Sequence, residues 1–261
     1  MNKNKHIAMW CCSRSRSTVT LRAFECLDEC VVFASPLYAS YLRFTDAPDP
    51  HRDEVFKNFE PDYKKMIATL TGELPEGKSF SFQRHVVQHV LPEFGRDWLK
   101  CLNNFFLIRH PKEMISSYHT LQEKAGIKQE LTLKDIGVEA LYRVFQEVEA
   151  ISGATPIVIE STDLAKNPSK TLKFICESFQ VNFSPKMLSW NTGLKDSVLQ
   201  NFDPSKSKEW LNAWCSTLMD SSGFLPYEEN DVNLPDELIP LLEECLPFYE
   251  KLVQHRQDLT K

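Results

Sequence analysis

The sequence predicts an α/β fold of three layers, α/β/α, around a central, mostly parallel sheet of about five strands. Short apolar runs rich in Val, Ile or Phe alternate with segments of helical periodicity, which is typical of βαβ units. The chain has 261 residues, 42% of them hydrophobic and 25% charged, so it can build a substantial core. We therefore expect a single domain over residues 1–261.

The candidate strands share three features. Each is short, is rich in β-branched or aromatic residues, and is bounded by polar or turn residues. They are residues 6–12, 30–34, 79–83, 104–108 and 156–160.

Three helices can be predicted between and after these strands. One starts at Asn167, a good N-cap before proline at the first helical position, and continues with apolar residues at i, i+3, i+4 and i+7 from Leu172. A second apolar stripe of the same spacing runs over residues 141–151. The third helix directly follows Ser17 and Thr18.

Two stretches differ from this pattern. Residues 43–77 and 191–235 are interrupted by several prolines, and residues 191–235 by glycines as well. We expect both to be excursions from the sheet rather than separate domains. Long irregular segments of this kind are commonly lids or substrate-binding loops, so we expect them to bind the acceptor or to cover it.

The net charge and the cysteines limit the expected binding partners and cellular compartment. A net charge of −6 argues against a general nucleic-acid or membrane-surface binder, so an anion site must be a local basic pocket. No apolar run is long enough to span a membrane, and no signal peptide is evident. The eight cysteines form no CxxC pair and lie mostly in apolar stretches. We expect buried, reduced thiols in a cytoplasmic protein.

The turn after the first strand is the strongest candidate for a binding site. A strand, a polar turn and a helix start bring free backbone N–H groups and the helix dipole to one point, which favours an anion. Two guanidinium groups and four hydroxyls reinforce that point, and arginine forks match phosphate oxygens in pairs. No glycine or lysine lies in the turn, which disfavours a magnesium-dependent P-loop hydrolase. A helix capped by Ser17 beside solvated arginines remains an alternative. The candidate residues are Ser13, Arg14, Ser15, Arg16, Ser17 and Thr18.

Two further groups carry chemistry. Arg109 follows the strand 104–108 directly, at the end where ligands of open α/β sheets bind, although a structural arginine–acid pair would look the same. His85 and His89 follow the strand 79–83 and are candidate general bases, since their unperturbed pKa lies near neutrality. Their spacing could also bind a metal, but no third ligand accompanies them. A packed or surface role remains open for both.

Residues 6–18 resemble the 5′-phosphosulfate-binding loop of the sulfotransferase family, in the bacterial branch with a Met-Trp-Ser-Gly-Pro-Arg-type loop. The resemblance implies a P-loop NTPase-like fold. Arg14 takes the place of the loop's basic residue, which would neutralise the bridging oxygen as the sulfuryl group leaves. Ser17 and Thr18 fall where the family's hydroxyls hold the 5′-phosphate. Cys12 and Ser13 replace the usual Gly-Pro.

Other segments extend the resemblance. Arg109, with Ser117 eight residues later, resembles the family's 3′-phosphate motif. The family's base aligns on His89, with His85 as the alternative, and Arg84 takes the place of a lysine. Residues 158–164 and 246–252 resemble a strand–turn–helix and the terminal helix of the family. Lys206, Lys208 and Arg22 are weaker candidates for donor phosphates. The family's Glu-Pro after the second strand is Ser35-Pro36 here, which puts the acceptor in question.

The resemblance implies a sulfotransferase that uses 3′-phosphoadenylyl sulfate (PAPS) as donor, without metal, by in-line transfer, and releases adenosine 3′,5′-bisphosphate (PAP). The expected acceptor is a hydroxyl or nitrogen of a small molecule, such as a bacterial secondary metabolite. A nucleotide-dependent kinase or hydrolase and a non-catalytic nucleotide-binding module remain alternatives, and the chain could be a monomer or a homodimer. Aromatic candidates for the pocket walls are Tyr38, Tyr41, Trp98, Trp190 and Trp210.

Overall fold

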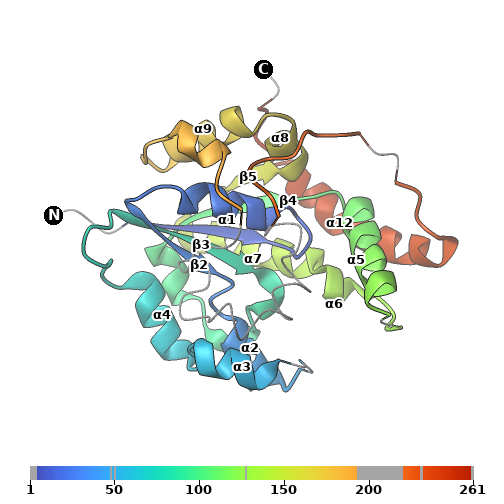
Figure 1. Ribbon diagram of the computed structural model, residues 1–261. Helices are drawn as coiled ribbons and strands as arrows, with labels where there is room; N and C mark the ends of the chain where they lie inside the picture. Colours follow the sequence, from blue (N-terminus) through green and yellow to red (C-terminus); the bar gives the residue numbers. More distant parts are fainter. Residues whose placement is uncertain are drawn as a thin grey trace.

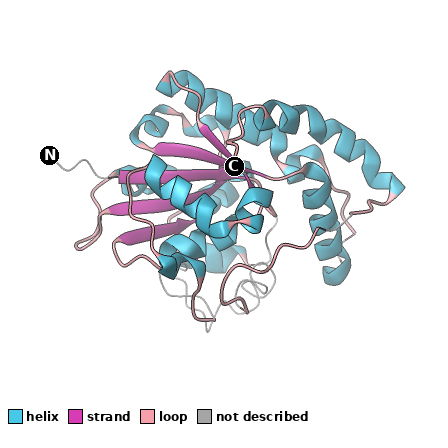
Figure 2. Cartoon of the chain, turned by 90° about the horizontal axis from the view of Figure 1, so that it is seen from above, coloured by secondary structure: helices cyan, strands magenta, loops and turns pink. Residues whose placement is uncertain are grey.

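The computed structural model describes residues 5–47, 49, 51–126, 128–192, 220–229 and 232–259. Five parallel strands lie side by side in one sheet in the order β2-β3-β1-β4-β5 (Figure 2). The prediction of an α/β fold with a five-stranded parallel sheet is therefore confirmed. The strands are β1 (Lys5–Cys11), β2 (Cys30–Ala34), β3 (Phe80–Val86), β4 (Asn103–Ile108) and β5 (Ile157–Glu160).

The central strand shows why the strands appear as unbroken apolar runs in the sequence. β1 pairs with β3 through Ile7 and Phe82 on one side and with β4 through Met9 and Phe105 on the other. Residues 6–11 are all buried, because helices cover both faces of the sheet. A strand buried on both faces has apolar side chains at nearly every position rather than at alternate ones, and the buried polar exception in β1, His6, lies 2.9 Å from the Ser81 hydroxyl.

Three helices cover one face of the sheet, the upper face in Figure 1. They are α1 (Ser17–Glu25), α8 (Ser161–Lys166) and α9 (Pro168–Ser178). Leu21 and Leu172 from these helices share a core cluster with Phe105 of the sheet. Helix α9 begins as the sequence predicts, since the Asn167 side chain accepts a hydrogen bond from the backbone N–H of Lys170.

The opposite face carries a second core. Trp10 and Phe106 of the sheet pack there with Phe145 and Leu252, which lie on two neighbouring helices. The predicted apolar stripe 141–151 lies on one of these helices. The helices of this side and its edge are α4 (Tyr63–Thr71), α5 (Pro111–Ala125), α6 (Leu133–Ile136), α7 (Val138–Ser152) and α12 (Ile239–Val253). In the described part of the chain, no helix has the length and apolar character needed to cross a membrane.

Residues 43–77 differ from the irregular segment that the sequence suggests. They hold the end of α2 (Tyr38–Thr45), then α3 (Arg52–Asn58) and α4. Pro61 lies between α3 and α4, and Pro75 follows α4, so both lie outside the helices rather than interrupting them. The short 3₁₀ turns are η1 (Val87–His89), η2 (Pro92–Phe94), η3 (Asp97–Cys101), η4 (Pro185–Leu188) and η5 (Asp236–Leu238).

The topology of the sheet determines which segments meet at its carboxyl edge. Because all five strands are parallel, their carboxyl ends meet at one edge, and the segments that follow them line up in the order of the strands. The segments after β2 and β3 therefore lie on one side of the turn after β1. The segments after β4 and β5 lie on the other side.

Candidate active site

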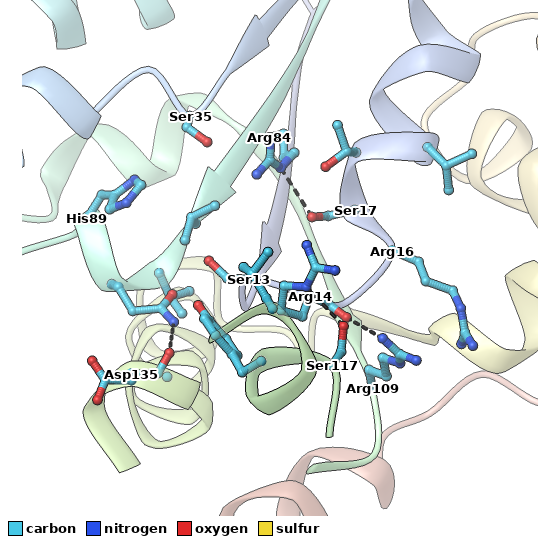
Figure 3. A pocket seen from close by; sticks show the side chains of 18 of the residues that line it. Ser13, Arg14, Arg16, Ser17, Ser35, Arg84, His89, Arg109, Ser117 and Asp135 are labelled. Carbon is cyan, nitrogen blue, oxygen red and sulfur yellow. Dashed lines mark hydrogen bonds between the residues drawn. The ribbon is translucent and has the colours of Figure 1, made fainter. Parts of the chain in front are cut away.

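A cavity of about 1480 Å³ opens at the carboxyl edge of the sheet. Figure 3 shows its labelled side chains in the order that the topology requires. Ser35 and His89 lie at the side of β2 and β3, the turn after β1 lies in the middle, and Arg109 lies at the side of β4. The residues predicted from three separate segments thus come together in one cavity.

The turn after β1 is held in an unusual backbone conformation. Arg14 and Arg16 both have φ of 63°, a left-handed conformation that costs a non-glycine residue about 1–2 kcal/mol. Backbone strain of this kind is concentrated at functional sites. The arginines thus occupy conformations that glycine adopts most easily, which explains how a loop without glycine can make this turn. Ser35, at the end of β2, is a third cavity residue with positive φ.

The start of α1 corrects one alternative left open by the sequence. The N-cap residue is Arg16, without a side-chain cap, so Ser17 does not cap the helix. The Ser17 hydroxyl instead accepts a hydrogen bond from Nε of Arg84 over 3.1 Å (Figure 3). The first turn of α1 contains no acid, which leaves the positive end of the helix dipole facing the turn. Ser15 is buried, and its hydroxyl donates to the carbonyl oxygen of Cys12 over 2.7 Å, so it supports the turn from within.

Helix α5 joins the turn directly. Nε of Arg14 donates to the Ser117 hydroxyl over 3.0 Å, and Nη1 of Arg109 donates to the Arg14 carbonyl oxygen over 2.6 Å (Figure 3). Arg109 also pairs with Glu113 through Nε and Nη2, at 3.0 and 2.8 Å. The structural ion pair that the sequence left open is therefore present. The Arg109 side chain lines the cavity all the same.

His89 lines the opposite side of the cavity, near Ser35 (Figure 3). It ends the short turn η1, and its ring centre lies 4.8 Å from that of Tyr38 and 5.3 Å from that of Tyr41. Burial, followed by the charge of Arg84 and by His85, lowers the pKa of His89 from 6.5 to about 3. The imidazole is therefore neutral at physiological pH.

His85 lies apart from the cavity. Its side chain is buried, stacks on Trp10 at 4.5 Å, and places Nε2 3.1 Å from Oε1 of Gln83. Successive side chains of a strand point to opposite faces, so Arg84 and His85 diverge at the end of β3. His85 does not belong to the residues that line the cavity. We therefore keep only His89 as the proposed base.

The other predicted residues also divide into those that line the cavity and those that do not. Arg22 is buried and bonds to Glu25 and to the Asn191 carbonyl oxygen, so it does not reach toward donor phosphates. Trp98 and Trp190 belong to the core clusters, whereas Tyr38 and Tyr41 line the cavity. Three of the predicted residues lie outside the described part of the chain: Lys206, Lys208 and Trp210.

Some cavity residues were not singled out as site residues from the sequence. Arg84 was aligned with a family lysine, but its contact with Ser17 depends on the register of β3 against β1. Residues 223–228 line the cavity from within the irregular stretch 191–235, which the sequence suggests as an acceptor-binding or covering segment without singling out any of these residues as a site residue. Glu113 follows Arg109 at i+4, a spacing that usually means a surface ion pair. Over the described residues, no cluster of His, Cys, Asp and Glu could hold a metal ion.

The comparisons with known proteins identify the family of the chain. The chain matches the family described as "Sulfotransferase domain" over residues 5–256. It is 26% identical over 250 residues to "Branched-chain-amino-acid aminotransferase-like protein 2" of Arabidopsis thaliana, covering 95% of this chain and 41% of that one. It is 25% identical to the Arabidopsis "Branched-chain-amino-acid aminotransferase-like protein 1", of which it covers 42%. The chain thus spans about two fifths of the length of these relatives.

One solved structure supports the fold. The sulfotransferase from Alicyclobacillus acidocaldarius has a TM-score of 0.52 against this chain at 11% sequence identity. The alignment covers 97% of both chains. At that identity the likeness speaks for the fold alone, and the family match over nearly the whole chain carries the assignment. Because the family model matches residues 5–256, nearly the whole chain, this chain belongs to the sulfotransferase family.

Proposed function

We propose that this chain transfers a sulfuryl group from 3′-phosphoadenylyl sulfate to a hydroxyl or nitrogen of a small acceptor. The observation that carries the proposal is the meeting of Arg14 with Ser117 and Arg109 at one end of a cavity that also holds His89. Guanidinium groups bind phosphate and sulfate oxygens in pairs. A cavity of about 1480 Å³ exceeds the usual size of a site for one ligand, roughly 300–1,000 Å³. It has room for donor and acceptor together.

The donor's two charged ends match two sets of residues. The turn over residues 13–18 and the start of α1 suit the 5′-phosphosulfate, because backbone N–H groups, hydroxyls and Arg14 converge there. Arg109 and Ser117 suit the 3′-phosphate, which distinguishes this donor from other adenosine 5′-phosphates. These groups provide the positive charge that the donor needs.

In the proposed step, an oxygen or nitrogen of the acceptor forms a bond to sulfur while the bond from sulfur to the donor's bridging oxygen breaks. The electron pair of that bond leaves with the bridging oxygen, and the product is adenosine 3′,5′-bisphosphate. Arg14 neutralises the charge that develops on that oxygen. The acceptor's proton passes to His89.

The low pKa of His89 suits this role. A neutral imidazole can accept a proton at physiological pH, and the pKa of about 3 keeps His89 neutral there. Such a pKa also makes the imidazole a weak base. A weak base is sufficient when the transition state is loose, because the acceptor then carries little positive charge until late in the transfer.

Arg84 is the proposed partner of the sulfuryl group itself. It lies between the turn and His89 in Figure 3 and donates to the Ser17 hydroxyl. A guanidinium at that place can bind the sulfuryl oxygens as their charge is redistributed in the transition state. It would thus act on the transferring group, while Arg14 acts on the leaving oxygen.

The acceptor is proposed to be a small aromatic or largely apolar molecule, for example a secondary metabolite. Tyr38, Tyr41 and Phe59 line the cavity together with His89. The Tyr38 hydroxyl donates to Asp49, which fixes its ring in place. Aromatic walls favour flat or apolar ligands. Most of the described cysteines, Cys11 and Cys12 among them, are buried and form no disulfide, while Cys101 is exposed; free thiols are consistent with the proposed reducing, cytoplasmic setting.

Thermal unfolding with two ligands tests the donor. Adenosine 3′,5′-bisphosphate is expected to raise the melting temperature, whereas ATP with Mg²⁺ is not. Stabilisation by ATP with Mg²⁺ alone would overturn the proposal in favour of a kinase or hydrolase. A panel of acceptors incubated with the donor, read by a mass increase equal to SO₃, then tests turnover. Bisphosphate binding without turnover on any acceptor would favour a non-catalytic module.

A further inference from the structure

Glu113 is shared by two arginines of the cavity. Its Oε2 accepts hydrogen bonds from Nε and Nη2 of Arg109, at 3.0 and 2.8 Å, and from Nη2 of Arg16 at 3.2 Å. The two arginines come from different segments, since Arg16 precedes α1 and Arg109 follows β4. One carboxylate oxygen on α5 therefore joins the turn after β1 to the end of β4.

Arg16 is held in place rather than solvated. Besides its bond to Glu113, its Nη1 lies 3.5 Å from the hydroxyl of Ser161, the first residue of α8, and its guanidinium carbon lies 5.8 Å from the centre of the Tyr227 ring. Its side chain is 27% exposed and lines the cavity. An arginine fixed by three neighbours has already lost much of its conformational freedom, which lowers the cost of binding an anion.

The hydrogen bonds of Arg109 leave part of its guanidinium for a ligand. Of the five N–H bonds of an arginine, two donate to Glu113 and one to the carbonyl oxygen of Arg14. Two N–H bonds of Arg109 thus have no partner within the part of the chain that the structure describes. Glu113 holds the Nε side of the group, so it fixes the plane in which the other N–H bonds lie.

The charges fit a phosphate monoester. Arg16 and Arg109 bring two positive charges and Glu113 brings one negative charge, which leaves one positive charge beside that of the neighbouring Arg14. A phosphate monoester carries about −1.5 to −2 at neutral pH. A single arginine paired with Glu113 would have no net charge, so a second guanidinium is needed to attract the phosphate.

On the basis of the proposed function, we infer that Glu113 is a positioning residue that holds Arg16 and Arg109 side by side. In this arrangement Arg16 supplies the second guanidinium of the 3′-phosphate site. Glu113 itself does not touch the donor. The negative charge of Glu113 lowers the net positive charge of the site by one unit. In return, its hydrogen bonds fix the two guanidinium groups in the arrangement that binds the 3′-phosphate.

Titration calorimetry of Glu113→Ala and Glu113→Gln with two ligands tests the inference. Glu113→Ala is expected to weaken the binding of adenosine 3′,5′-bisphosphate at least about tenfold, the equivalent of one lost charge-assisted hydrogen bond, and to change that of adenosine 5′-phosphate less than about threefold. Glu113→Gln keeps one acceptor oxygen, so its affinity for adenosine 3′,5′-bisphosphate is expected to lie between those of Glu113→Ala and the unchanged protein. Glu123→Ala, an exposed position on the same helix, is the matched control and should bind both ligands as the unchanged protein does.

The outcomes separate the inference from the proposed function. Equal weakening for both ligands by Glu113→Ala and Glu113→Gln would show that Glu113 only supports the fold. Tighter bisphosphate binding would show that Glu113 competes with the phosphate. Either result overturns the inference and leaves the proposed function standing. Failure of the unchanged protein to bind the bisphosphate would instead overturn the proposed function.

A second variant tests Arg16 on its own. Arg16→Gly removes the guanidinium and keeps the left-handed conformation without strain. It is expected to weaken bisphosphate binding about tenfold with little change for adenosine 5′-phosphate. Equal losses for both ligands would place Arg16 at the 5′ end and overturn its assignment to the 3′-phosphate.

Discussion

Nε of Arg84 donates to the Ser17 hydroxyl over 3.1 Å, and this bond ties the end of β3 to the first residue of α1. The side of the cavity that holds His89 is thereby joined to the side proposed for the donor. The same guanidinium lowers the pKa of His89. Arg84 thus contacts the turn proposed for the donor and also influences the proposed base.

Replacement of Arg84 should reduce turnover more than donor binding. Arg84→Ala is expected to lower kcat by about 10²–10³, the usual effect of removing one transition-state donor. The affinity for adenosine 3′,5′-bisphosphate should change less than about threefold, because Arg14 and Arg109 remain. Steady-state kinetics and calorimetry measure the two quantities. Arg96→Ala serves as control, since Arg96 pairs with Glu147 outside the cavity. Loss of donor affinity with kcat intact would contradict the assignment.

The pH dependence of kcat/KM should show no titration of His89 near pH 6.5, the pKa of an ordinary histidine. Since the pKa of His89 is lowered to about 3, the free enzyme keeps this base neutral down to well below pH 6.5. We expect kcat/KM to be insensitive to His89 protonation between about pH 5 and 8, while His89→Asn lowers kcat by about 10²–10⁴. A pH profile of both proteins checks this. An acidic limb near pH 6.5 that disappears in His89→Asn would contradict the environment described for His89.

Acid should destabilise the protein through His85. Burial lowers the pKa of His85 from 6.5 to about 3, so below pH 6.5 the unfolded chain binds a proton that the folded chain does not. The free energy of unfolding should therefore fall as the pH drops from 6.5 toward 3, by up to about 2 kcal/mol at pH 5 for this one residue. His85→Phe keeps an aromatic ring against Trp10 and should show a smaller decrease. Urea unfolding at pH 7 and pH 5 measures the difference, and identical pH dependence in both proteins would refute it.

Glu160 should act in the opposite direction. Burial raises the pKa of this carboxyl from 4.5 to about 7, so the folded chain binds the extra proton. The raised pKa of Glu160 adds to the free energy of unfolding; this addition is fully present below pH 4.5 and is lost as the pH rises through about 7. Glu160→Gln should therefore be more stable than the unchanged protein at pH 8, by up to about 3 kcal/mol, and similar at pH 4. The amide oxygen can still accept from the Tyr249 hydroxyl, which donates to Glu160 over 2.9 Å. Equal unfolding free energies at pH 8 would contradict this expectation.

Much of the fold could be predicted because the sheet is buried on both faces. A strand without a solvent face is mostly apolar, so the apolar runs of β1 and β4 stand out in the sequence. The last three residues of β3 were missed, because the predicted strand 79–83 stops before Arg84 and His85, and the polar His85 finds its partners only in the folded core. The helices around Pro61 could not be seen either, since a proline between two helices and a proline in a loop look the same in a sequence.

Residues of the candidate site could be predicted where a charged or hydroxyl side chain lies at or after the end of a strand. Arg14, Arg109 and Ser117 combine charge or a hydroxyl with a place at or after a strand end, and the structure brings them into contact. Other contacts depend on three-dimensional register. Whether Arg84 or His85 points toward the cavity follows from the face of the strand, and the link between Glu113 and Arg16 follows from the packing of α5 beside the turn.

The left-handed conformations of Arg14 and Arg16 have a consequence for how this loop can change. In a glycine-containing loop, one residue makes the turn and another carries the charge, so each can be replaced without the other. Here the same two residues do both. Glycine at position 16 would relieve about 1–2 kcal/mol of strain but would also remove the contacts of Arg16 with Glu113, Ser161 and Tyr227, so we expect Arg16→Gly to melt close to the unchanged protein while it binds the bisphosphate more weakly. Relief of strain in this loop therefore comes only with the loss of a guanidinium from the cavity.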